Sequence, residues 1–198
     1  MTSTWYETVD ATTPLMQGDI IFDCPVVAWK EAPLEVISGQ EAEALKVATE
    51  VIAADVIVMT QACDLENYKV SNAILCPHYS LAEYKTYWEK EVRSLPMPEG
   101  QPPQNPTAKA WRSFCADVKE GYQWNLAMLN ADEGVNAAHR IVDFHEVYTA
   151  PRVFLESLLK SRNRERLRLL PPYREHLSQA FARFFMRVGL PTPIAKAW

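Results

Sequence analysis

The sequence contains no long hydrophobic run. Among its 198 residues, no stretch of 18 consecutive apolar residues occurs, and this excludes a membrane-spanning helix of ordinary length. The segment Met1–Glu7 lacks the basic and apolar regions of a secretory signal peptide. We therefore expect a cytoplasmic protein without a membrane partner.

Cysteines are few and widely spaced. The four thiols, Cys24, Cys63, Cys76 and Cys115, include no Cys-x2-Cys pair, the usual zinc knuckle. A disulfide framework is not expected in a cytoplasmic chain of this length, so we expect reduced thiols.

Familiar catalytic patterns are also missing. The sequence has no Walker loop, no G-x-G-x-x-G, no G-x-S-x-G and no H-E-x-x-H, so it shows none of the common nucleotide, hydrolase or metalloprotease signatures. What is present is enough apolar material, 48% of residues, for a sizeable core. The length fits a single domain over residues 1–198.

Charge is unevenly distributed along the chain. Residues 1–150 carry 10 basic and 22 acidic residues, whereas residues 151–198 carry 10 basic and 3 acidic ones. The basic segment 152–174 could bind nucleic acid, or it could pack on the acidic body. No aromatic residues interleave the arginines, as they would in a platform for single strands, which favours packing.

The hydrophobic patterns predict an α+β fold dominated by strands. We expect strands over 18–25, 26–37, 44–52, 55–60, 73–77, 124–129 and 140–148, with a helix over 40–49 as the alternative to strand 44–52. We expect helices over 81–95, 107–120, 152–160 and 172–188. Five prolines in 96–106 indicate a loop, so 81–121 is predicted to be a helical insertion.

The C-terminal helix, 172–188, has a regular apolar stripe that should dock on the sheet. The stripe consists of Tyr173, Leu177, Phe181, Phe184 and Val188. Along one flank lie His176, Arg183 and Arg187, with Arg174 near the start of the helix. Arginine forks bind phosphates or carboxylates, so Arg174, Arg183 and Arg187 are candidate binding residues.

The most informative stretch is 55–64. The apolar run Val56–Met59 predicts a strand that is buried on both faces, and such a strand fixes the residues at its end in space. Thr60, Gln61, Cys63 and Asp64 follow directly. We therefore expect a site at this strand end, with Gln61, Cys63 and Asp64 as binding residues.

Three interpretations of this cluster remain open. Cys63, Cys76 and His78 could form a metal site, for which zinc is the natural ion. Cys63 could be a nucleophile with a histidine as base, although the neighbouring Asp64 opposes the low thiol pKa that this requires. In the third interpretation, Cys63 is half-buried and Asp64 and Thr60 cap backbone groups.

The order of these elements resembles the PemK/MazF superfamily of SH3-like barrels. The segments Gly18-Asp19-Ile20, Ile141–Phe144 and Pro151-Arg152 carry this resemblance. Thr60–Asp64 resembles, in addition, a prokaryotic family with Ser/Thr-Gln-x-Cys-Asp at a strand end and a C-terminal helix like Tyr173–Gly189. The resemblances imply an SH3-like barrel with a helical insertion and a docked C-terminal helix.

MazF-like toxins cut single-stranded RNA with an Arg-Pro pair and a Ser/Thr at strand ends. This chain has Ala53-Ala54-Asp55 in place of the Arg-Pro and only a displaced Ser80. Our leading hypothesis is therefore a non-catalytic interaction or regulatory module of a bacterial stress or defence system, with a protein partner or a homo-oligomer. The alternatives are a divergent endoribonuclease, with Thr60, Asp64, His78, Arg174 and His176 as candidate catalytic residues, and a metal-binding protein.

Overall fold

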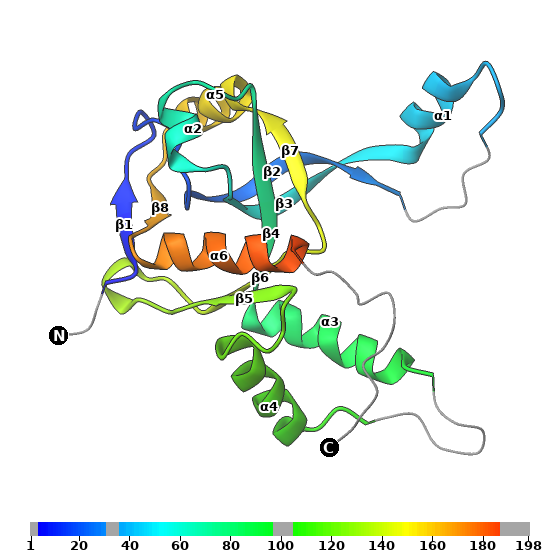
Figure 1. Ribbon diagram of the computed structural model, residues 1–198, viewed down its shortest axis with the longest axis vertical. Helices are drawn as coiled ribbons and strands as arrows, with labels where there is room; N and C mark the ends of the chain where they lie inside the picture. The colour runs from blue at the N-terminus through cyan, green and yellow to red at the C-terminus, as the bar shows by residue number, and fades with distance from the viewer. Residues whose placement is uncertain (1–3, 31–35, 97–104, 187–198) are drawn as a thin grey trace, which may run out of the picture.

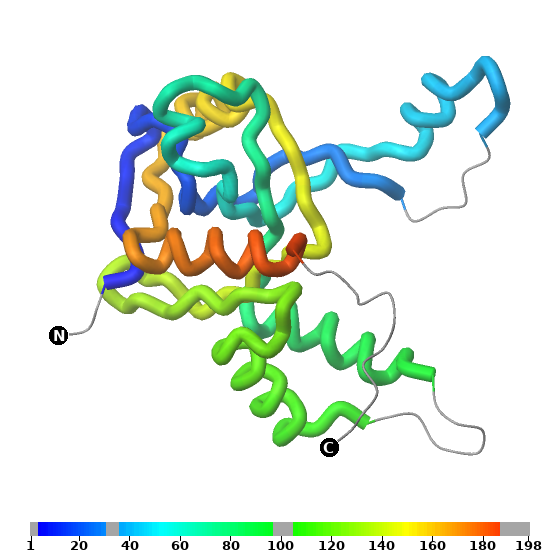
Figure 2. The backbone as a smooth tube through the Cα atoms, in the orientation of Figure 1, coloured from blue at the N-terminus to red at the C-terminus, as the bar shows by residue number. Residues whose placement is uncertain are grey.

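The computed structural model describes residues 4–30, 36–96 and 105–186 (Figures 1 and 2). It shows an α+β fold in which all strand pairs are antiparallel. The strands are β1 (Tyr6–Val9), β2 (Ile20–Trp29), β3 (Thr49–Val58), β4 (Asn72–Ser80), β5 (Leu126–Leu129), β6 (Arg140–Asp143), β7 (Tyr148–Pro151) and β8 (Arg166–Leu169). The helices are α1 (Glu41–Ala48), α2 (Ala62–Glu66), α3 (Leu81–Ser94), α4 (Ala108–Lys119), α5 (Arg152–Arg162) and α6 (Tyr173–Phe185), with a 3-10 turn at Glu133–Val135.

Six strands form the main sheet, and two form a separate ribbon. The sheet order is β2-β3-β4-β6-β5, with β7 also paired to β4. The ribbon consists of β1 and β8, which the hydrophobic patterns did not predict. An isolated bridge between Asp19 and Arg168 joins the ribbon to the start of β2.

Strand β3 confirms the prediction of a strand buried on both faces. Val56 and Val58 belong to a core cluster beneath α5, while Ile57 and Met59 belong to another cluster beneath α6. None of the four is more than 5% exposed. Because successive side chains of a strand point to opposite faces, one apolar run serves both cores.

The start of β3 corrects one prediction. Residues 41–48 form helix α1, the alternative that the sequence left open, and the strand predicted over 44–52 is wrong at its N-terminal half. The two strands predicted over 44–52 and 55–60 are also not separate, because β3 runs through residues 53 and 54 without interruption. The period-two pattern in this region reflects exposed apolar residues rather than a buried strand face.

Strand β2 is longer than expected and contains a bulge. It continues past Pro25 to Trp29, so the prediction that Pro25 ends the strand is wrong. Pro25 is tolerated because β2 is an edge strand of this sheet. The register shifts between Ile21 and Cys24, where Asp23 has a φ of +49°.

The strand predicted over 140–148 is divided in two. β6 pairs with the C-terminal part of β4 and β7 with its N-terminal part, and an irregular segment separates them. The alternation of apolar and polar residues over 140–148 did not reveal this interruption, because β6 and β7 both pair with the same strand, β4.

The structure confirms both helices predicted in the segment between β4 and β5. Ser80 and Glu83 form a capping box at the start of α3, and Gly121 ends α4 with a φ of +77°. Their aromatic side chains form a small core of their own against β5 and β6. That core contains Tyr84, Trp88, Trp111 and Phe114.

The C-terminal helix packs as its stripe predicts. In α6, Tyr173, Leu177, Phe181 and Phe184 all contact the core cluster beneath it, while Val188 lies outside the described residues. In Figure 1, α6 crosses the sheet and runs beside its β5–β6 end. None of the helices in the described residues has the length and hydropathy that a membrane span requires.

Candidate functional site

The strand end at Thr60 is held together by its own side chains. Thr60 is 6% exposed, and its Oγ1 accepts a hydrogen bond of 2.6 Å from the Ile74 backbone N–H. This bond ties the end of β3 to β4. Thr60 therefore caps a backbone N–H, as the third interpretation predicts.

Of the three polar residues that follow, Cys63 and Asp64 lie on the short helix α2, and Gln61 directly precedes it. The exposed Cys63 has its Sγ 3.8 Å from Gln61 Oε1 and 3.7 Å from Asp64 Oδ1. Asp64 lies 3.7 Å from Lys69 Nζ. In the described part of the chain, the hydrogen-bond partners of this thiol are these two oxygens and no histidine is among them, so its contacts do not form the nucleophile–base pair of the second interpretation.

A cavity of about 280 Å³ lies at this strand end, between α2 and α6. Thr60, Gln61 and Asp64 line it from one side, and Ser178 and Phe181 from the other. The fold thus brings part of the C-terminal helix to the predicted cluster. A buried glutamine fixes the contact: Gln17 Nε2 donates to the Met59 carbonyl at 3.1 Å and to Ser178 Oγ at 2.6 Å.

The basic flank of α6 does not line this cavity in the described part of the chain. Arg174 instead pairs with Glu175 on its own helix, with Nη2 to Oε1 at 2.7 Å. His176 and Arg183 are exposed, and Arg187 lies outside the described residues. The structure therefore does not unite the candidate catalytic residues of α6 with Thr60 and Asp64.

The predicted metal ligands are likewise separated. Cys76 is fully buried in the core beneath α6, whereas Cys63 is exposed on α2. Burial, with a smaller effect of Asp143, raises the pKa of the Cys76 thiol to about 12. Within the described ranges, no group of three or more His, Cys, Asp or Glu side chains could hold a metal ion.

His78 lies in a cross-strand cluster that sequence reasoning missed. It is 1% exposed, and Arg140 Nε on β6 donates to its Nδ1 at 2.6 Å. Since Nδ1 accepts, the ring proton is assigned to Nε2. Burial, followed by the charge of Arg140, lowers the pKa of His78 to about 3, while the Val56 carbonyl has a smaller opposite effect. A buried, neutral imidazole in this place is a packing residue and cannot touch a substrate.

Arg140 also connects this cluster to β3 and β2. Its Nη2 is 2.5 Å from Asp55 Oδ2, and its guanidinium lies 4.9 Å from the centre of the Phe22 ring. Asp55, from the segment 53–55 that departs from the MazF-like pattern, is thus paired with an arginine of β6. Arg140 reaches this cluster because the strand register pairs it with Ser80, and that register is set only in the folded sheet. The only indication of the cluster in the sequence was the departure from the MazF-like pattern at Asp55.

Most arginines of the basic segment 152–174 bind within the protein. Arg166 and Arg168 both pair with the fully buried Asp19, with Nε to carboxylate distances of 2.9 and 2.6 Å. Arg166 also donates to backbone carbonyls of the 10–14 loop. Arg152 pairs with Glu156 on α5. This arrangement corresponds to packing on the acidic body, the second interpretation of the charge asymmetry.

The chain matches no known family model, no curated protein and no solved structure.

Proposed function

We propose that this protein is a non-catalytic interaction module that binds a protein partner through a projecting arm. The arm comprises residues 25–30 and 36–53, which include the outer halves of β2 and β3 and helix α1. It extends away from the body in Figures 1 and 2. The resemblance to PemK/MazF proteins would place such a module in a bacterial stress or defence system.

The observation that carries this proposal is an exposed apolar face on the arm. Val27 and Val51 lie opposite each other in the β2–β3 register and are 60% and 72% exposed, and Trp29 is 68% exposed. Full burial of side chains of this kind stabilises by about 1.5–3 kcal/mol each. A contiguous apolar face on a projecting element is typical of an interaction site.

Helix α1 and the segment before it continue this apolar character. The exposed apolar residues there are Val36, Ile37, Leu45 and Val47. The arm therefore offers a two-stranded ribbon and a helix with little core of their own. At the base of the arm, Val26 and the half-buried Ile52 pack into the core beneath α5 and anchor it.

The strand edges of the arm point to the same conclusion. β4 pairs with β3 only at Val56–Val58, so residues 49–54 have β2 as their strand partner within the described residues. A two-stranded ribbon by itself is marginally stable in water. A bound partner that covers the apolar face, or adds a strand to an edge, would stabilise it.

For the fold, we propose an SH3-like barrel of the PemK/MazF type. The Asp19–Arg168 bridge supports this, because it places the β1–β8 ribbon beside the start of β2. An experimental structure in which β8 pairs along β2 would support the barrel. One in which the ribbon stands apart from β2 would contradict it.

The proposed function is tested by placing positive charges on the apolar face of the arm. The double variant Val27→Lys, Val51→Lys disrupts the apolar face, and Val153→Lys is the control, because Val153 is a 66% exposed valine on α5. We expect a partner that the wild type and the control retain in affinity purification, or a dimer in analytical ultracentrifugation, to be lost in the double variant. If every partner is retained by the double variant, or the wild type is monomeric and retains none, the proposal fails.

A further inference from the structure

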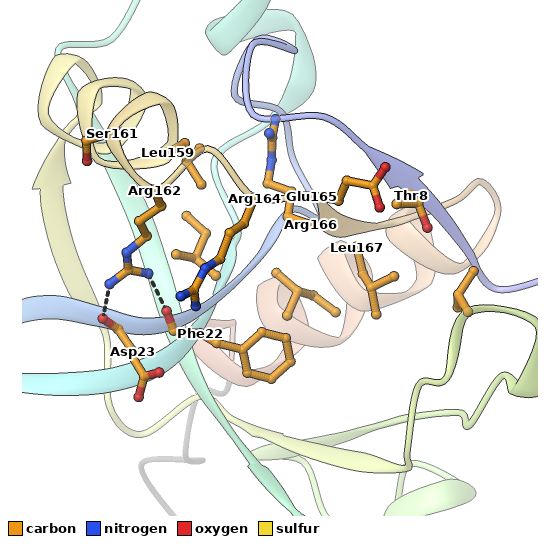
Figure 3. Close-up of a pocket in the computed structure, with 13 residues that line it drawn as sticks. Thr8, Phe22, Asp23, Leu159, Ser161, Arg162, Arg164, Glu165, Arg166 and Leu167 are labelled. Atoms are coloured by element: carbon orange, nitrogen blue, oxygen red, sulfur yellow. Dashed lines mark hydrogen bonds between the residues drawn. The ribbon is translucent and has the colours of Figure 1, made fainter.

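A second cavity lies away from the strand-end cluster, between α5, β8 and β2. Its volume is about 690 Å³, within the range of pockets that hold small organic ligands. Figure 3 shows the side chains around it, including Phe22 from β2, Arg162 at the end of α5 and Arg164 from the segment before β8. Thr8 and Ser161 add hydroxyl groups to the lining.

Two guanidinium groups at this cavity lack a carboxylate partner in the described part of the chain. Arg162 Nη1 and Nη2 each donate a 2.6 Å bond, to the carbonyls of Phe22 and Asp23. These neutral acceptors orient the guanidinium but leave its charge uncompensated. Arg164 is exposed and forms neither a hydrogen bond nor an ion pair with any described residue. In Figure 3, both side chains extend toward β2 near Phe22.

The nearby carboxylates do not neutralise these charges. Asp23 and Glu165 also line the cavity, but neither forms an ion pair with Arg162 or Arg164 among the described residues. Figure 3 shows the Asp23 carboxylate turned away from Arg162 and the Glu165 carboxylate on the side of Thr8. Arg166, in contrast, is compensated by the buried Asp19.

The opposite wall of the cavity is apolar and well supported. The Phe22 ring is 42% exposed, and it packs edge-on to His78, with ring centres 5.6 Å apart. The Arg140 guanidinium, itself held by Asp55, contacts the same ring. Leu167 adds a half-buried apolar surface. The cavity therefore combines an apolar wall with two uncompensated cations.

We propose that this cavity binds a small organic anion, with its phosphate or carboxylate group between Arg162 and Arg164 and its apolar part against Phe22 and Leu167. Guanidinium groups bind both kinds of acid through paired, charge-assisted hydrogen bonds. Placing two arginines side by side costs free energy in the empty protein, and an anion offsets that repulsion. This site is separate from the arm and does not depend on the function proposed above.

The test uses simple aromatic probes and the full chain. Phenyl phosphate and phenylacetate supply the two kinds of acid group, and benzyl alcohol is the neutral probe of similar size. We expect at least one of the two acids to bind saturably in isothermal titration calorimetry, at least tenfold more tightly than benzyl alcohol. The comparison of the two acids identifies the preferred acid group.

Variants assign the binding to this cavity. Arg164→Gln should weaken binding of the acid at least tenfold, since one charged donor is lost, without changing the thermal unfolding midpoint. The control is Arg112→Gln, an exposed arginine on α4, which should bind as the wild type does. The proposal is overturned if neither acid binds more tightly than benzyl alcohol, or if Arg164→Gln binds the acid as well as the wild type.

Discussion

At the scale of single residues, the fold buries polar side chains in two different ways. His78 is buried as a neutral ring, with an arginine donating to it from the neighbouring strand. Asp19 is buried in ion pairs with two arginines, and the Met16 backbone N–H donates a further hydrogen bond to it. Each arrangement has a measurable consequence for stability.

We expect His78 to make the protein less stable in mild acid. Its pKa is lowered from 6.5 to about 3 in the folded state, so the unfolded chain takes up a proton first as the pH falls. The stability is fully present above pH 6.5 and is lost progressively as the pH falls toward 3. Between pH 7.5 and 5.5, above most carboxylate titrations, the loss is about 1.4 kcal/mol. Urea unfolding at both values measures it.

The matched variant is His78→Gln, which keeps an acceptor for Arg140 but does not titrate. We expect the loss between pH 7.5 and 5.5 to shrink by most of that amount in the variant. An equal pH dependence in both proteins would show that His78 is protonated in the folded state or already released from its site.

We expect Asp19→Asn to be strongly destabilising. It removes the only carboxylate that pairs with the buried Arg166 in the described structure, and breaking a buried ion pair costs about 3–5 kcal/mol. The control is Glu7→Gln, because Glu7 is 46% exposed and lies 3.9 Å from Arg168, the other arginine that pairs with Asp19. The control should cost less than about 1 kcal/mol in urea unfolding. Similar costs for the two variants would contradict a structural role for Asp19.

At the scale of elements, β3 is one strand with two environments. Its inner end is buried in both cores, and its outer end forms part of the exposed arm. Strand β2 has the same division, and the bulge at Phe22 and Asp23 lies where the two regions meet. The strands therefore connect a rigid body to an element with little core of its own.

Two substitutions of the same kind in β3 measure this difference. Val58→Thr places a hydroxyl in a fully buried position and should cost about 1–3 kcal/mol if the group finds no partner. Val51→Thr, at a 72% exposed position, should change the unfolding free energy by less than about 0.5 kcal/mol. Equal costs in denaturant unfolding would show that the arm face is covered in the isolated protein.

The base of the arm should depend on Arg162. Its guanidinium holds the carbonyls of Phe22 and Asp23, and the Asp23 N–H donates to Asp55 Oδ1 at 3.0 Å from the other side. In Arg162→Gln, we expect amide hydrogen exchange at the bulge to accelerate at least tenfold, because the bulge can open without breaking the two hydrogen bonds from Arg162. Exchange in α3 should stay unchanged. An unaltered rate at the bulge would mean that the clamp contributes nothing to its order.

At the scale of the whole molecule, the acidic body and the basic segment are less separate than the sequence suggests. Five of the seven basic residues from Arg152 to Arg174 bind side chains or carbonyls of the protein itself. Lys160 and Arg164 have no such partner in the described residues. The segment 152–174 thus uses its positive charge mainly to hold parts of the molecule together.

We therefore expect weak binding to single-stranded RNA with a small dependence on salt. Each neutralised phosphate of a single strand contributes about −0.7 to the slope of log K against log salt. The two cations of this segment without a partner among the described residues, Lys160 and Arg164, would therefore give a slope of about −1.4. Fluorescence anisotropy with a labelled oligonucleotide from 50 to 200 mM salt measures the slope. A slope steeper than about −4 would indicate a nucleic-acid interface that these contacts do not explain.

The sequence by itself determined the local features of this protein. The run Val56–Met59 predicted a doubly buried strand, the stripe of 172–188 predicted a docked helix, and apolar spacing predicted α3 and α4, while the predicted loop between them falls mostly on 97–104, outside the described residues. These features depend on periodicity and on residue type, which are properties of neighbours along the chain. For the same reason, the short strands β1 and β8 and the interruption between β6 and β7 escaped prediction.

Only the tertiary structure decided which polar residues meet. Arg140 reaches Asp55 and His78, and Arg166 reaches Asp19, across more than 60 residues of sequence. Cys63 and Cys76, which look alike in the sequence, lie respectively at the surface and in the core. Such pairings depend on strand register and on the packing of distant segments. No local pattern encodes them, because the energy that selects a register comes from the whole sheet and its two cores.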